Sequence, residues 1–131
     1  MESGEKVYII GRLDKELYSC VSPDIQTEEV IITEDRIEHI KARHPNDFEH
    51  FFQYAEEIIE SPDYILEANK PHTALILKRI TENGKNYRLI LRLKTSRDPA
   101  KYKNSVITFL KVKDKEWNRC IKNKKILYKS E

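Results

Sequence analysis

The sequence of 131 residues predicts a single α+β domain, in which helices pack on one face of a twisted antiparallel sheet. Apolar residues recur at helical spacing through Phe48–Ile59 and predict a core helix. Two alternating runs, Thr73–Ile80 and Tyr87–Lys94, flank Asn83–Gly84, which is the pattern of a β-hairpin with a type I′ turn. With 131 residues, of which 39% are hydrophobic, the chain is long enough for one domain with one core and too short for two.

The N-terminal part predicts short strands. Val7–Leu13 is expected to be the first strand, with Leu17–Val21 as its hairpin partner and a turn at Ser22–Asp24. Val30–Ile32 is a further short apolar strand.

Two helices are expected next. Thr33 is placed to cap the first helix, and Pro45 ends it at or before His44. The second helix begins with Asn46 and Glu49, which have the spacing of a capping box, and it stops at Ser61–Pro62.

The rest of the chain predicts an antiparallel meander, then a short helix capped by Asp114, and a closing strand. The expected strands are Tyr64–Ala68, Thr73–Ile80, Tyr87–Lys94, Ser105–Val112 and Ile126–Tyr128.

Charge divides the chain into two halves. Residues 1–70 hold 7 Lys and Arg against 17 Asp and Glu, a net charge of −10, whereas residues 71–131 hold 17 against 5, a net charge of +12. A basic half of this kind favours contact with a polyanion, of which nucleic acid is the commonest. The sequence has neither an apolar run long enough for a membrane span nor a signal-peptide pattern. Cys20 and Cys120 are far apart in sequence with no CxxC pattern, which favours reduced thiols, with a disulfide between the two as the alternative. We therefore expect a cytoplasmic protein.

The first long helix carries two histidines in different positions. On a helical wheel, Arg36, His39 and Arg43 share one arc, and His44 falls in the neighbouring apolar arc. His44 is expected to be mainly structural, at the negative end of the helix dipole. His39 is either a solvated surface residue or a functional one.

Cations alternate along the predicted hairpin. Arg88 and Arg92 share one face of their strand, and Lys78 lies on the opposite side of its own strand from Leu75 and Leu77. These cations form either a solvated sheet face or a phosphate-binding surface.

The residue types limit the chemistry. No metal-ligand spacing, glycine-rich phosphate loop or local nucleophile pattern occurs in the sequence, so we expect no cofactor and no metal. Histidine, lysine, arginine and hydroxyl groups suit RNA cleavage, in which the 2′-OH is a built-in nucleophile.

The ordered segments ITEDRIEHIKARHP, ESPDYI, TALILKRI with NYRLILRL, NSVITF and KKILYK resemble the phage-associated barnase/EndoU/colicin/RelE-like nuclease domains. The resemblance spans about Val30–Lys129, and it leaves residues 1–29 as an N-terminal extension or hairpin. It implies helices against a curved antiparallel sheet and a metal-independent ribonuclease of toxin or effector type. Some relatives cut tRNA or translated mRNA.

The resemblance also implies roles for individual residues. His39 matches the acid or base, and Lys78 and Arg92 match phosphate ligands, so we expect these three side chains to converge on one patch. Ser105 and Thr108 match hydroxyl donors, although in a regular strand they point to opposite faces and only one faces the site, unless a bulge intervenes. The other expected substrate-binding residues are Arg36, Arg43, His44 and Arg88.

Two other hypotheses compete with the ribonuclease. The first is a non-catalytic module that holds RNA or DNA on its basic sheet. The second is an interaction domain whose basic face docks an acidic, antitoxin-like or immunity-like protein, which is also compatible with an enzyme. The acidic half of one copy and the basic half of another predict a homodimer as a further mode of association.

Overall fold

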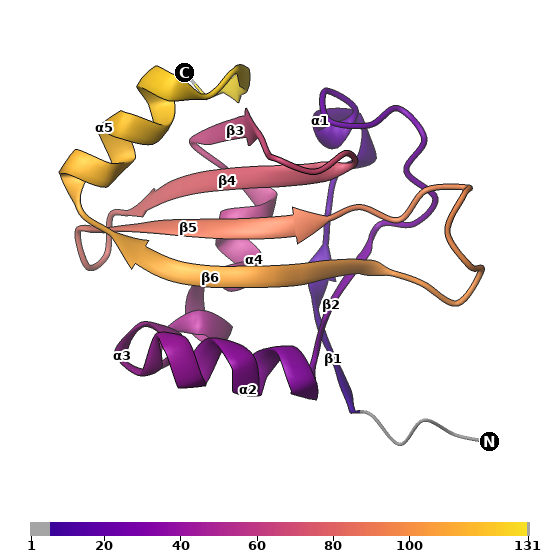
Figure 1. Cartoon of the computed structure of the whole chain (residues 1–131), viewed down its shortest axis with the longest axis horizontal. Coiled ribbons are helices and arrows are strands. Elements are labelled where there is room, and N and C mark those ends of the chain that lie inside the picture. The colour runs from indigo at the N-terminus through magenta and orange to yellow at the C-terminus, as the bar shows by residue number, and fades with distance from the viewer. Residues whose placement is uncertain (1–5, 131) are drawn as a thin grey trace.

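The structure is a computed structural model that describes residues 6–130, and it has the predicted α+β architecture (Figure 1). Seven strands form one sheet in the order β1-β2-β6-β5-β4-β3-β7, antiparallel except between β2 and β6. The elements in chain order are β1 (Val7–Arg12), α1 (Lys15–Tyr18), β2 (Glu29–Thr33), α2 (Glu34–Arg43), α3 (Pro45–Phe48), α4 (Phe51–Glu60), β3 (Tyr64–Glu67), β4 (Thr73–Ile80), β5 (Lys85–Arg92), β6 (Asn104–Val112), α5 (Asp114–Asn123) and β7 (Ile126–Lys129).

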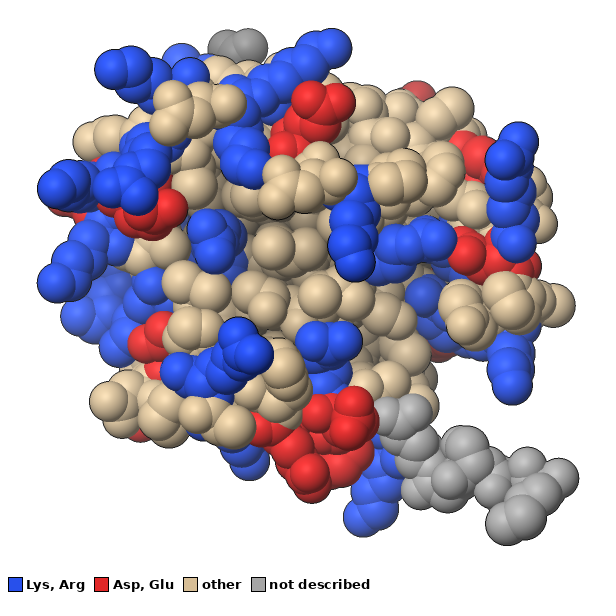
Figure 2. Space-filling model, in the orientation of Figure 1, with Lys and Arg blue, Asp and Glu red and all other residues tan. Residues whose placement is uncertain are grey.

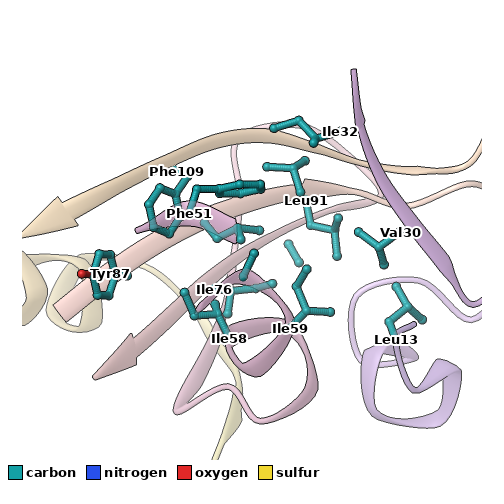
Figure 3. Packing of buried hydrophobic residues seen from close by; sticks show 14 of the residues in the cluster. Leu13, Val30, Ile32, Phe51, Ile58, Ile59, Ile76, Tyr87, Leu91 and Phe109 are labelled. Carbon is teal, nitrogen blue, oxygen red and sulfur yellow. The ribbon is translucent and has the colours of Figure 1, made fainter. Parts of the chain in front are cut away.

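The main core lies between the sheet and α4, which Figure 1 shows behind β4 and β5. The apolar stripe of α4 faces the strands, and aromatic rings interlock across the contact (Figure 3). The Phe51 and Phe109 ring centroids are 5.0 Å apart, and those of Tyr87 and Phe109 are 5.2 Å apart. Removing a buried aromatic ring of this kind costs about 3–5 kcal/mol of stability.

The helix α5 covers part of the opposite face of the sheet, so the structure differs from the prediction that the helices pack on one face. Trp117 and Cys120 of α5 join a second, smaller cluster with Leu75 and Leu77 of β4. Asp114, which was expected to cap this helix, is its first residue and follows the N-cap Lys113. Its carboxylate instead accepts hydrogen bonds from Arg79 and Asn86, which tie the start of α5 to the β4–β5 hairpin.

The helix α2 follows the sequence prediction. The Thr33 hydroxyl accepts a hydrogen bond from Arg36 N at 3.1 Å, and the last helical residue is Arg43, just before the C-cap His44. The helix that follows differs from prediction, because it is divided into α3 and α4. Pro45 starts a helical turn at once, with His44 as its N-cap, so the predicted capping box from Asn46 does not form.

Two details of the predicted hairpins are wrong. Leu17–Val21 is not a strand, because Asp14 caps α1 through Glu16 N and Leu17 N, and β1 pairs with β2 instead. The β4–β5 connection is a four-residue loop, residues 81–84, closed by a hydrogen bond from Gly84 N to Ile80 O. In this loop Gly84 has a φ of +70° and Asn83 does not have a positive φ, so the turn is not type I′.

No helix among residues 6–130 combines the length and apolar character that a membrane crossing requires.

Candidate nucleic-acid site

A cleft of about 450 Å³ opens on the part of the sheet that α5 leaves uncovered, on the face away from α4. We call it the cationic cleft, and Figure 2 views this face of the molecule. It is lined by Arg36, Ala68, Asn69, Lys70, Thr73, Leu75, Ile90, Arg92, Ile107 and Lys124.

Four cations from four parts of the chain line the cleft. Arg36 comes from α2, Lys70 from the β3–β4 connection and Arg92 from β5, and Lys124 is the C-cap residue of α5. Lys124 Nζ donates to Asn69 Oδ1 at 2.9 Å, which joins the end of α5 to the β3–β4 connection. Among the described residues, the lining contains no Asp or Glu, so the cleft favours an anionic ligand.

The floor of the cleft is apolar. Leu75, Ile90 and Ile107 project from three neighbouring strands between the cations. An apolar floor inside a cationic rim suits a nucleotide, since its base and sugar have apolar faces and its phosphate is an anion.

Arg92 is held by a neighbouring carboxylate. Its Nη2 lies 2.9 Å from Asp98 Oδ1, its Nη1 donates to Asp98 Oδ2 at 3.3 Å, and Nη1 also donates to the Leu93 carbonyl. The pKa of Asp98 is lowered, first by the hydrogen bond from Thr95 N and also by Arg92. Asp98 therefore stays ionised and orients the guanidinium, whose charge it partly offsets.

A β-bulge turns Ser105 and Thr108 to the sheet face that carries the cleft, although neither residue is part of the cleft lining. Ser105 pairs with Arg92 and Thr108 pairs with Ile90, because the register shifts between Ile90 and Leu91 and leaves Ile107 as the extra residue. The Ser105 hydroxyl donates to Lys103 O at 3.2 Å.

The helix α2 runs beside β6 (Figure 1), and its Arg36 forms one side of the cationic cleft. It follows β2, whose Ile31 pairs with Ser105, and it leads to Asp47, which accepts a hydrogen bond from Lys111 N. Arg36 lines the cleft, while His39 is exposed one turn further along and Arg43 another turn on. His44 is half-buried, and its backbone N–H donates a hydrogen bond to Ile40 O at 2.7 Å.

The prediction that Lys78 lies on the same patch as His39 and Arg92 is wrong. Lys78 follows Ala74 and Ile76 onto the face that packs on α4, where it pairs across the hairpin with Tyr87. Its side chain is 15% exposed, and its Nζ lies 3.6 Å from Asp63 Oδ1. Lys78 therefore lies on the opposite side of the sheet from Arg92.

Arg88 shares the cleft face with Arg92 but lies outside the cleft lining. Its Nη1 is 3.9 Å from Glu116 Oε2, so α5 separates it from the open part of the face.

Three site residues escaped the sequence analysis, namely Lys70, Lys124 and Asp98. They lie in connections, where no periodic pattern marks the direction of a side chain. The one local indication was the spacing of Thr95 and Asp98, whose backbone-to-carboxylate hydrogen bond is typical of a polar turn.

No group of three or more His, Cys, Asp or Glu side chains within residues 6–130 is arranged to hold a metal ion.

Comparison with known proteins identifies one family. The model described as phage-Barnase-EndoU-ColicinE5/D-RelE like nuclease2 matches residues 10–129, which includes every element that lines the cleft. No curated protein and no solved structure matches the chain.

Proposed function

Because the chain belongs to the phage-Barnase-EndoU-ColicinE5/D-RelE like nuclease family, we propose that it is a metal-independent endoribonuclease whose substrate lies in the cationic cleft. The observation that carries this proposal is the cleft itself, which combines four cations, the Thr73 hydroxyl and an apolar floor.

The proposed reaction is attack of a 2′-OH on the adjacent phosphate. A base removes the 2′-OH proton, the 2′-oxygen bonds to phosphorus, and the 5′-oxygen leaves with a proton from an acid. The products are a 2′,3′-cyclic phosphate and a 5′-OH. Arg36 and Arg92 hold the phosphate and stabilise the charge that develops on its oxygens.

His39 is the proposed acid or base. It is exposed on α2, between the cleft residue Arg36 and Arg43. Ser105 and Thr108 are the proposed hydrogen-bond donors from β6, since the bulge turns both to the same face. Arg43 and His44 extend the substrate contact along α2.

Incubation of the wild type and His39→Ala with total tRNA and a mixed-sequence RNA in EDTA tests this function. We expect the wild type to leave 2′,3′-cyclic phosphate ends and His39→Ala to be at least about 100-fold slower. His50→Ala is the matched control, because His50 lies beside Glu49 and Tyr54, outside the cleft lining. Cleavage that requires a divalent ion, or that survives His39→Ala, would contradict the proposal.

The second candidate is a module that binds RNA without cutting it. The observation in its favour is that His39 lies outside the cleft lining. If this candidate is right, neither the wild type nor His39→Ala cleaves RNA, and both bind RNA less tightly as the salt concentration rises.

An acidic protein partner is compatible with either function. The cleft lining presents four cations without a carboxylate among the described residues, so an acidic segment would compete directly with RNA. A poly-glutamate peptide that displaces bound RNA at low salt would support this partner, whereas one that binds without displacing RNA would place it elsewhere.

A further inference from the structure

A second hollow of about 380 Å³ lies next to the cationic cleft. Its lining is mainly polar and includes Lys70, His72 and Lys125, together with the Glu67 carboxylate and the Cys20 thiol. This lining therefore has two lysines, Lys70 and Lys125, and one carboxylate, Glu67.

The two hollows share one wall. Ala68, Asn69, Lys70 and Thr73 line both of them, so they lie on the two sides of the β3–β4 connection. Two consecutive lysines line different hollows: Lys124 lines the cleft, and Lys125 lines the second hollow. Cations therefore continue from the cleft across Lys70 into the second hollow.

His72 is fixed in its position. Its carbonyl accepts a hydrogen bond from Leu93 N at 2.8 Å, which ties it to the end of β5. Its ring Nδ1 lies 3.1 Å from Ser22 Oγ, on the segment between α1 and β2. The residue has a φ of +56°, a left-handed conformation that costs free energy and is held by this surrounding structure.

We infer that the second hollow binds the nucleotide next to the one in the cationic cleft, with the RNA strand crossing the wall at Lys70. This inference rests on the proposed function. Lys70 and Lys125 contact the phosphate on the far side of the wall, and His72 provides a hydrogen bond from its other ring nitrogen. RNA of several nucleotides then binds more tightly than a mononucleotide because it fills both hollows.

Cys20 gives a direct test of occupancy. It is exposed in the second hollow, whereas Cys120, the other cysteine of the chain, is 5% exposed. Although Cys20 is exposed, partial desolvation of its thiol raises the pKa of this group, so less of it is thiolate at neutral pH and its alkylation by iodoacetamide is slower than that of a fully solvated cysteine.

The probe is a ten-nucleotide 2′-O-methyl RNA, which lacks the 2′-OH nucleophile and stays intact. We expect it to slow Cys20 alkylation at least about fivefold at saturation, because a bound strand excludes the reagent from the hollow. Uridine monophosphate at the same concentration will protect Cys20 much less, because a mononucleotide does not gain affinity from filling both hollows. If fluorescence anisotropy shows that the oligonucleotide binds but Cys20 is not protected, the second hollow does not hold a nucleotide, and the proposed function is unaffected. Failure of the oligonucleotide to bind at all would overturn both.

A matched pair of variants separates direct contact from an indirect effect on Cys20. Lys125→Gln will weaken binding of the same oligonucleotide by about fivefold, the cost of one phosphate contact at low salt. Lys122→Gln removes an exposed lysine of α5 that lines neither hollow, and it will leave the affinity unchanged. Equal effects of the two substitutions would contradict the inference.

Discussion

Arg92 and Asp98 form an ion pair at the edge of the cationic cleft, with Nη2 of the arginine 2.9 Å from Oδ1 of the aspartate. Asp98 is the less exposed partner, at 12% against 38% for Arg92. The aspartate also accepts hydrogen bonds from Thr95 N and the Thr95 hydroxyl, so the loop after β5 holds the carboxylate that orients the arginine.

The ion pair makes stability depend on pH. The folded structure lowers the pKa of Asp98 from its ordinary 3.8, so the ionised carboxylate stabilises the fold above that value. This contribution is lost as pH falls through the lowered pKa. Asp98→Asn will cost about 1–2 kcal/mol at neutral pH, and the difference from wild type will shrink below about pH 4. Urea unfolding at several pH values measures this difference, and a gap that stays constant down to pH 2 would contradict the assignment.

The Thr108 hydroxyl is expected to act on the substrate and not on the fold. Thr108→Val keeps the shape of the side chain and will slow RNA cleavage about tenfold, which corresponds to one lost hydrogen bond of about 1.4 kcal/mol. The melting temperature will change by only a few degrees, because the side chain is half-buried at the cleft face. A Thr108→Val variant that cleaves RNA at the wild-type rate would show that the Thr108 hydroxyl does not act on the substrate.

Tyr18 ties the N-terminal segment to the core. Its side chain is 0% exposed, and its hydroxyl donates to Ile59 O at 2.7 Å. Tyr18→Phe leaves that buried carbonyl without this donor and will destabilise the protein by about 1–2 kcal/mol. RNA cleavage at a temperature well below the melting point will match wild type, since Tyr18 lies outside the cleft lining. An unchanged unfolding free energy would show that the hydrogen bond contributes nothing.

The cleft cations also predict how binding depends on salt. For single-stranded nucleic acid, the logarithm of the association constant falls with the logarithm of salt by about 0.7 per phosphate contact. Arg36→Gln will therefore reduce the slope by about 0.7, as measured by anisotropy with 2′-O-methyl RNA. Lys113→Gln is the control, because Lys113 follows the far end of β6 and does not line the cleft. The same slope for Arg36→Gln and wild type would exclude a phosphate contact at Arg36.

The sequence predicted most of the fold because its patterns are local. Alternation in Thr73–Ile80 matched β4 residue for residue, and Thr33 with Pro45 marked both ends of α2. Leu17–Val21 was mistaken for a strand, because the short helix α1 depends on Asp14 and on burial of Tyr18 against Ile59.

The site was harder to predict, because it depends on which face of the sheet is covered. In β4, Ala74, Ile76 and Ile80 share a face with Lys78, while Leu75 and Leu77 share the other, so both faces have apolar residues. Only the packing of α4 decides that Lys78 points away from the cleft. The bulge at Ile107 could not be predicted either, since nothing in the sequence Val106–Thr108 indicates an extra residue in the strand.

The proposed function places RNA on the cleft face of the sheet, where Arg92 lies, and not on the α4 face, where Lys78 lies. Cleavage of the same RNA by Arg92→Gln and Lys78→Gln, at a temperature where both are folded, distinguishes the two faces. We predict that Arg92→Gln will lower kcat/KM by about 100-fold or more, and that Lys78→Gln will stay within about threefold of wild type. The reverse order, with Lys78→Gln inactive and Arg92→Gln active, would place the RNA on the α4 face of the sheet.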